Sequence, residues 1–110
     1  MTIVHIVLFQ LKSTADATAA DDITKYMLAL RDQCVHPDTG VPYIKSTIGG
    51  LNNSKEPLSG GLTHAFVVEF ENEQDRDYYV KEDPHHKAFK ASINGKIEKV
   101  VVVDFTPGVF

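Results

Sequence analysis

The stretch "KEDPHHKAFK", residues 81–90, combines a helix start with two groups that can transfer protons. Asp83 is a good N-cap because its carboxylate accepts the free N–H groups of a first helical turn, and Pro84 suits the first helical position. His85 and His86 then lie in that turn, where the helix dipole disfavours their charged forms. A neutral imidazole kept there is a competent general base. The alternative is that both histidines are surface residues that follow a helix start.

The spacing of this helix does not decide between the two histidines. Phe89 and Ile93 define its apolar face. At about 100° per residue, His86 falls about 40° from the centre of that face and His85 about 60° on the other side. Helical geometry therefore favours His86 only slightly.

Three further polar residues fall on apolar faces of predicted strands, because strand side chains alternate between the two faces of a sheet. The sets are His5 with Val7 and Phe9, His64 with Phe66, and Asp104 with Val100 and Val102. If these faces point the same way, two imidazoles and a carboxylate share one apolar, substrate-binding compartment. Taken singly, a histidine in a strand is more often a hydrogen-bonded core residue than a catalyst. No closely spaced metal-ligand motif or nucleotide fingerprint occurs, so we predict no metal site and no cofactor.

The elements that must position these residues follow from periodicity and from start and stop signals. We expect strands over residues 3–11, 41–52, 62–71 and 97–105, and helices over 13–35, 72–80 and 84–94. The order is the ferredoxin-like β-α-β-β-α-β arrangement, an α+β fold with a four-stranded antiparallel sheet and helices on one face.

The predicted strands are apolar on both faces, although the helices suffice to cover only one. In the first strand, Val4, Ile6 and Leu8 oppose the face of His5. An exposed apolar sheet face needs a partner, and two copies packed sheet to sheet about a two-fold axis would supply it. We therefore predict a homodimer, a dimeric α+β barrel.

Composition restricts the classes of partner. The chain of 110 residues is 43% hydrophobic and 24% charged, as expected for one domain over residues 1–110. Its net charge is −4 without a basic cluster, so we expect neither nucleic acid nor an anionic membrane as a partner. A signal peptide and a membrane-length apolar run are both missing, which favours a cytoplasmic protein. The single cysteine, Cys34, is better explained as a small buried hydrophobe than as a nucleophile.

Three separated motifs resemble one family. They are "VHIVLFQLK", "GGLTHAFVVEFENEQDRDYYVKEDPHHKAF" and "VVVVDFTP", and they resemble, in the same order, the stress-responsive A/B barrel domain family. The resemblance covers nearly the whole chain and implies a dimeric α+β barrel.

The resemblance also implies roles for residues. A plant polyketide cyclase of that family performs an aldol condensation without a cofactor, using a tyrosine and a histidine as its acid–base pair. Those positions match Tyr79 and His86, not His85. His5 and His64 match pocket histidines, and Asp104 matches an aspartate in the final motif.

Two functional hypotheses remain open, and a third ranks below them. The first is a cofactor-free lyase or cyclase acting on a polyketide-like or other β-dicarbonyl substrate in a small apolar pocket between sheet and helices. There His86 takes a proton, Tyr79 holds His86 and stabilises an enolate, and His5, His64 and Asp104 orient substrate or water. The alternative is a non-catalytic stress-response or ligand-binding protein whose polar residues satisfy one another. The third is an oxygenase related only by fold.

Overall fold

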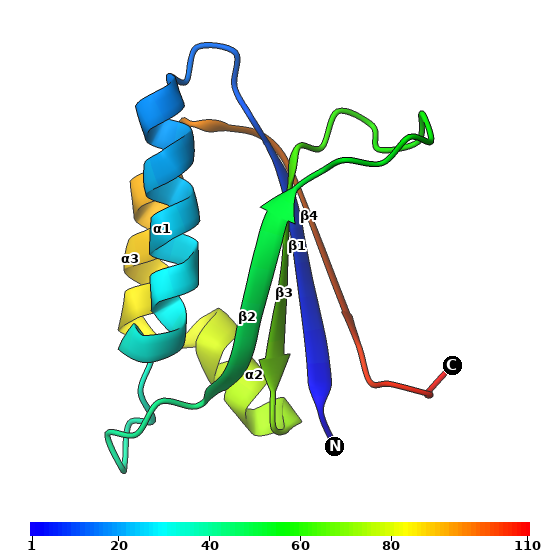
Figure 1. The fold of residues 1–110 in the computed structure, drawn as a ribbon. Coiled ribbons are helices and arrows are strands. Elements are labelled where there is room, and N and C mark those ends of the chain that lie inside the picture. Colours follow the sequence, from blue (N-terminus) through cyan, green and yellow to red (C-terminus); the bar gives the residue numbers. More distant parts are fainter.

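A computed structural model describes all residues 1–110 and contains four strands and three helices (Figure 1). The elements run β1 (Ile3–Leu11), α1 (Ala17–Gln33), β2 (Ile44–Leu51), β3 (His64–Phe70), α2 (Glu73–Lys81), α3 (Pro84–Ile93) and β4 (Ile97–Phe105). The strands form one antiparallel sheet in the order β2-β3-β1-β4. The predicted ferredoxin-like α+β fold is confirmed. No helix is long and apolar enough to cross a membrane.

Short polar signals set the helix ends. Asp16 caps α1, accepting from the Ala19 N–H at 2.8 Å, and Asn72 caps α2 in the same way. Asp83 caps α3, which begins at Pro84 as the sequence predicts. The first helix starts four residues later than position 13, because Asp16 is its N-cap.

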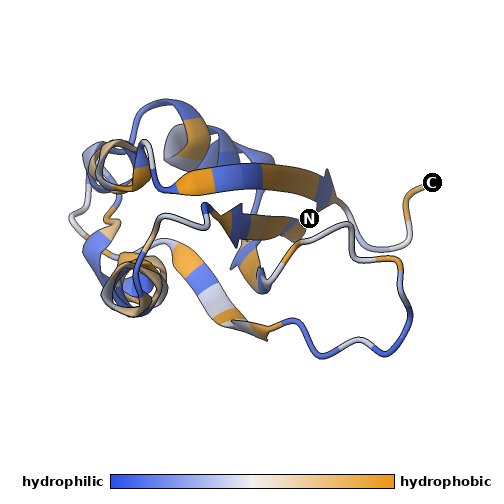
Figure 2. Ribbon diagram, turned by 90° about the horizontal axis from the view of Figure 1, so that it is seen from above, coloured by the Kyte–Doolittle hydropathy of each residue, from blue (hydrophilic) through white to orange (hydrophobic).

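All three helices lie on one side of the sheet (Figure 2). The side chains that fill the space beneath them include Phe66, Val68 and Phe70 of β3 and Met27 and Leu30 of α1, each at most 2% exposed. Gly49 of β2 permits close packing, since a Cβ there would lie 2.3 Å from the Phe66 ring. The core therefore sits mainly over β2, β3 and β1.

The other side of the sheet is apolar and open. Strand register places Ile6, Val67, Val103 and Ile48 side by side on it. Ile48 is 67% exposed and Val103 51% exposed. The sheet is thus two-faced, as the alternation of the strands predicts, and the helices cover one face only.

Candidate functional site

A cavity of about 870 Å³ lies between the helix-side face of the sheet and helices α2 and α3. Helix α1 packs along β2 and α3, so it leaves the edge strand β4 partly uncovered. Val100 and Val102 of β4 line the cavity and are still more than half exposed. The apolar part of the lining comprises Val7, Phe9, Met27, Val80, Phe89, Ile93, Ile97, Val100 and Val102. A cavity of this size and character suits a small, largely apolar organic molecule.

His86 enters this cavity from the first turn of α3. Its backbone N–H lies 3.4 Å from the Asp83 carboxylate, and its ring Nδ1 lies 2.8 Å from the carbonyl oxygen of Tyr79. A carbonyl only accepts, so Nδ1 must carry the proton and Nε2 keeps its lone pair when the ring is neutral. Nε2 has no protein partner and is not sealed from solvent.

Burial keeps this imidazole uncharged. It lowers the pKa of His86 to about 4; nearby Lys90 and His5 lower it further, while the bond to the Tyr79 carbonyl works in the opposite direction. His86 is therefore a neutral base at neutral pH, with one nitrogen free to take a proton.

Tyr79 holds His86 differently from the sequence-based expectation of an acid–base pair. The two rings stack with centroids 3.9 Å apart and 16° between their planes, and the hydrogen bond to His86 comes from the Tyr79 backbone carbonyl. The Tyr79 hydroxyl makes no hydrogen bond to a protein group, although the side chain lines the cavity. Burial raises the pKa of this hydroxyl, so it stays protonated and can donate a hydrogen bond.

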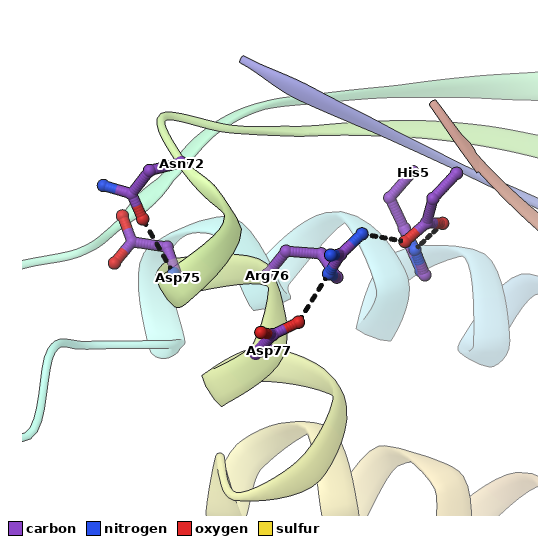
Figure 3. A network of polar contacts seen from close by, with 6 residues as sticks. His5, Asn72, Asp75, Arg76 and Asp77 are labelled. Carbon is purple, nitrogen blue, oxygen red and sulfur yellow. Dashed lines mark hydrogen bonds and ion pairs between the residues drawn. The ribbon is translucent and has the colours of Figure 1, made fainter. Parts of the chain in front are cut away.

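A second imidazole is held at the same end of the cavity. His5 of β1, 4% exposed, places Nδ1 2.6 Å from Oδ1 of Asp104 on the neighbouring β4. The other oxygen of Asp104 accepts from the Arg76 guanidinium at 3.0 Å, and Arg76 Nε donates to Asp77 at 2.7 Å. Figure 3 shows Arg76 reaching from α2 toward His5. The four side chains form one chain of polar contacts, and all four line the cavity.

A profile of the Stress responsive A/B Barrel Domain family matches residues 3–107. The chain belongs to that family. A protein of the same domain type from Arabidopsis thaliana, At5g22580, is 33% identical over 104 residues, which cover 92% of this chain and 82% of the relative.

Several solved structures of other proteins share this fold. At3g17210 from Arabidopsis thaliana is 25% identical, with a TM-score of 0.82 over 98% of this chain and 97% of the other. A hydroxynitrile lyase from Passiflora edulis is 22% identical, with a TM-score of 0.83 over 99% and 96%. A dimeric ferredoxin-like protein from Thermobifida fusca is 23% identical, with a TM-score of 0.75 over 96% and 91%.

In this A/B barrel domain, most of the residues singled out from the sequence meet around the cavity. His5, Val7, Phe9, Tyr79, His86, Val100, Val102 and Asp104 all line it. His64 and Phe66 share the same face of the sheet but do not line the cavity. His64 stacks on Phe9 with centroids 5.0 Å apart, its Nδ1 lies 2.8 Å from the Thr63 hydroxyl, and burial lowers its pKa. It pairs with Phe9 four residues from His5 along β1, so the two histidines do not meet.

Sequence reasoning overlooked Arg76 and Asp77. They look like an exposed charged run, "DRD", at the start of a short helix. Arg76 nevertheless precedes Tyr79 by three residues, so both side chains project from neighbouring parts of one helix face. Once Tyr79 was placed in a pocket, that spacing was the signal that could have placed Arg76 there.

A second group of buried polar side chains surrounds Asp83, the carboxylate that caps α3. The Tyr43 hydroxyl donates to Oδ2 of Asp83 at 2.6 Å, while Oδ1 of Asp83 accepts from the His85 N–H at 2.8 Å. Burial, and then the Asp83 charge, raise the pKa of the adjacent Cys34 to about 12, so the thiol stays protonated. Cys34 is 0% exposed, which agrees with its reading as a buried small residue. No three His, Cys, Asp or Glu side chains are grouped so that they could hold a metal ion.

Proposed function

We propose that this A/B barrel domain is a cofactor-free acid–base catalyst that acts on a small carbonyl compound in the cavity. The observation that carries this proposal is His86, a neutral imidazole with Nδ1 bound to a carbonyl and Nε2 free beside an apolar cavity. Such a group can remove a proton from a carbon next to a carbonyl, which is the first step of aldol-type condensation or cleavage.

The other groups around His86 suit the charge that this step creates. When Nε2 of His86 takes the α-proton, the C–H electron pair moves into the C–C bond and negative charge builds on the carbonyl oxygen. The Tyr79 hydroxyl, protonated and free of protein partners, can donate a hydrogen bond to that oxygen. The apolar side chains around His86 and Tyr79 strengthen both interactions.

A neighbour with known chemistry supports this class of reaction. The Passiflora edulis protein with the same fold is a hydroxynitrile lyase, so lyase chemistry occurs on this scaffold. The substrate proposed here rests on the cavity of this chain. Half of its lining residues are apolar, and the rest include His5, His86 and several charged side chains: Arg76, Asp77, Lys90, Glu98, Lys99 and Asp104.

The experiment is deuterium exchange at the α-carbon of phenylacetone, a small apolar ketone, followed by proton NMR in D₂O. We expect the wild-type protein to accelerate the exchange and His86→Gln to lower the rate about 10²–10⁴-fold. His85→Gln is the matched control, because His85 is exposed and does not line the cavity. Equal exchange by wild type and His86→Gln would refute the assignment of the base.

A second candidate, ligand binding without chemistry, is favoured by one observation. His5, Asp104, Arg76 and Asp77 satisfy one another without any ligand, as expected for a structural network. This alternative predicts that phenylacetone or a larger apolar ligand binds, that exchange stays at the rate of buffer, and that His86→Gln changes affinity only.

We also propose that the working unit is a homodimer formed through the open face of the sheet. Neighbours of the same fold are described as dimeric, and the open face carries Ile48, Val103 and Phe105, each at least 45% exposed. Size-exclusion chromatography with light scattering tests this: we expect twice the 12.2 kDa chain mass for wild type and a shift to one chain for Val103→Glu. Leu28→Glu, a similar change on exposed α1, is the control and should stay dimeric.

A further inference from the structure

Lys90 is a charged residue of the cavity that the proposed reaction does not use. It follows His86 by four residues on α3, so the two side chains lie next to each other on one face of the helix. Phe89 and Ile93 belong to the same face, and all four residues line the cavity. Lys90 is exposed, and a lysine in such a place packs its apolar stem along the wall and keeps its ammonium group at the rim.

Two observations place this ammonium group beside the polar end of the cavity. Its Nζ lies 3.5 Å from the carbonyl oxygen of Val80, the residue that follows Tyr79 on α2. Its positive charge also adds to the effect of burial, which lowers the pKa of His86. A contact of 3.5 Å is at the limit of a hydrogen bond, so the ammonium group keeps its donors free for a ligand.

The other cations of the cavity are less suited to a ligand. Arg76 already contacts the carboxylates of Asp77 and Asp104. Lys99 Nζ lies 3.3 Å from a loop carbonyl, and Lys99 is five residues from Asp104 along β4, about 16 Å from the polar end. Lys90 makes no ion pair with a carboxylate of the protein. Its charge is therefore both unpaired and close to the base.

The charges of α3 favour an anion at this rim. The helix carries Lys87 and Lys90 and no acidic residue, although the whole chain has a net charge of −4. The acidic side chains of the cavity, Asp77, Glu98 and Asp104, come from α2 and β4 instead. An anion that approaches along α3 is therefore attracted and meets no carboxylate from that helix.

We propose that Lys90 binds a carboxylate of the ligand and that the substrate class is an apolar keto acid. This inference rests on the proposed function. The apolar body of the acid lies against the cavity wall, its carbonyl group lies beside His86 and Tyr79, and its carboxylate stays at the rim next to the Lys90 ammonium group. A carboxylate at the rim keeps part of its hydration, whereas one placed deep among the apolar side chains would be strongly destabilised.

The bound carboxylate also improves the base. Burial lowers the pKa of His86, and the positive charge of Lys90 lowers it further because it disfavours the imidazolium. A carboxylate beside Lys90 offsets that charge, so the pKa of His86 rises when the acid is bound. A base whose pKa lies nearer to the working pH takes the α-proton more readily. A keto acid is therefore favoured over the corresponding neutral ketone in binding and in proton removal.

The first test measures binding and needs no turnover. The probes are 3-phenylpropanoate, which is phenylpyruvate without its keto group, and the uncharged 3-phenylpropanamide, titrated into the whole protein in a calorimeter. We expect Lys90→Met to weaken binding of the carboxylate about three- to tenfold and binding of the amide by less than about twofold. Lys90→Arg, which keeps the charge, should bind the carboxylate within about twofold of wild type.

Lys87→Met is the matched control, because Lys87 is an exposed lysine of the same helix that does not line the cavity. It makes the same change in net charge and should leave both affinities unchanged. No binding of 3-phenylpropanoate by wild type, or equal weakening in Lys90→Met and Lys87→Met, would overturn the proposal. An equal loss of both probes in Lys90→Met would also overturn it and indicate a structural role for the contact with Val80.

A second measurement separates this inference from the proposed function. Phenylpyruvate and phenylacetone share the benzylic α-carbon and differ by a carboxylate, so their α-hydrogen exchange in D₂O is compared after subtraction of the rate in buffer. Lys90→Met should raise KM for phenylpyruvate about three- to tenfold, change kcat little, and not lower the exchange of phenylacetone. Exchange that needs His86 but is equal in Lys90→Met and Lys87→Met would overturn this inference and leave the proposed reaction standing. Binding of 3-phenylpropanoate that depends on Lys90, without exchange of either ketone, would support the carboxylate site and overturn the proposed reaction instead.

Discussion

Asp83 and Asp104 are both carboxylates whose two oxygens are each held by a polar contact, yet they occupy opposite kinds of surroundings. Asp83 is 1% exposed, lies beside Cys34 and Tyr43, and does not line the large cavity. Asp104 has a side chain that is 23% exposed and lies at the wall of the large cavity. The same chemical group therefore has a structural function where no ligand can reach it, and can take part in chemistry where a cavity opens beside it.

Tyr43, Asp83 and Cys34 form a closed, buried cluster, and this closed cluster explains how His86 is held in place. Tyr43 precedes β2 directly, and Asp83 precedes α3, so their 2.6 Å hydrogen bond ties the sheet to the start of the helix that carries His86. Asp83 also accepts from the N–H groups of His85 and His86. The open network around Asp104 instead joins β1, β4 and α2 at the cavity.

The largest contrast is expected for truncation of the two carboxylates. Asp83→Ala removes the cap of α3 and leaves the buried Tyr43 hydroxyl without its acceptor, so it should lower the free energy of unfolding by about 3–4 kcal/mol. Asp104→Ala leaves His5 and Arg76 beside a cavity that water can enter, and should cost about 1–2 kcal/mol. Urea unfolding of both variants checks this, and an equal loss would mean that the cavity end is as structural as the closed cluster.

The positions of these two carboxylates could be predicted from the sequence, but their hydrogen-bond partners could not. The Asp83–Pro84 pair predicts the start of α3, and the alternation of strand side chains predicts that His5 and Asp104 lie on apolar faces. Both signals are local, since each lies within a few consecutive residues. The partners of these carboxylates lie far away along the chain: Tyr43 is 40 residues from Asp83, and Arg76 is 28 residues from Asp104. Local patterns predict which face a residue occupies, whereas register and helix docking decide that His5 meets Asp104 and that His64 meets Phe9.

The hydroxyl of Tyr43 gives a smaller test of the closed cluster. Tyr43→Phe keeps the ring in the core but removes the hydrogen bond to Asp83, so it should cost about 1–2 kcal/mol of unfolding free energy. Tyr26→Phe is the matched control, because the Tyr26 hydroxyl makes no hydrogen bond to a protein group and its ring packs on Phe89. A loss in Tyr43→Phe no greater than that in the control would show that the hydrogen bond adds little to the docking of α3.

Acidification should affect the open end of the cavity through His86. Its pKa is about 4 in the folded protein, against about 6.5 in an unfolded chain, so the unfolded state binds the extra proton first. The corresponding stability is complete above about pH 6.5 and is lost as the pH falls toward 4. Allowing for solvent screening of the partly exposed ring, the loss is about 1–2 kcal/mol. It appears as the difference between wild type and His86→Gln in unfolding experiments at pH 7 and pH 4.5, and an unchanged difference would contradict a neutral, buried His86.

Labelling by a thiol reagent is the smallest effect expected, and it tests directly whether the region around Asp83 is closed to solvent. Cys34 is fully buried, and burial raises its pKa to about 12, so a thiol reagent such as 5,5′-dithiobis(2-nitrobenzoate) should not label it measurably at neutral pH while the protein is folded. A cysteine introduced in place of Val102, which lines the cavity and is 53% exposed, should react readily in the background Cys34→Ser. That background should stay within about 1–2 kcal/mol of wild type, because serine is close to cysteine in size and its hydroxyl would lie beside the Asp83 carboxylate. Rapid labelling of Cys34 at its natural position would mean that the region around Asp83 opens to solvent, and that the two carboxylates differ in degree and not in kind.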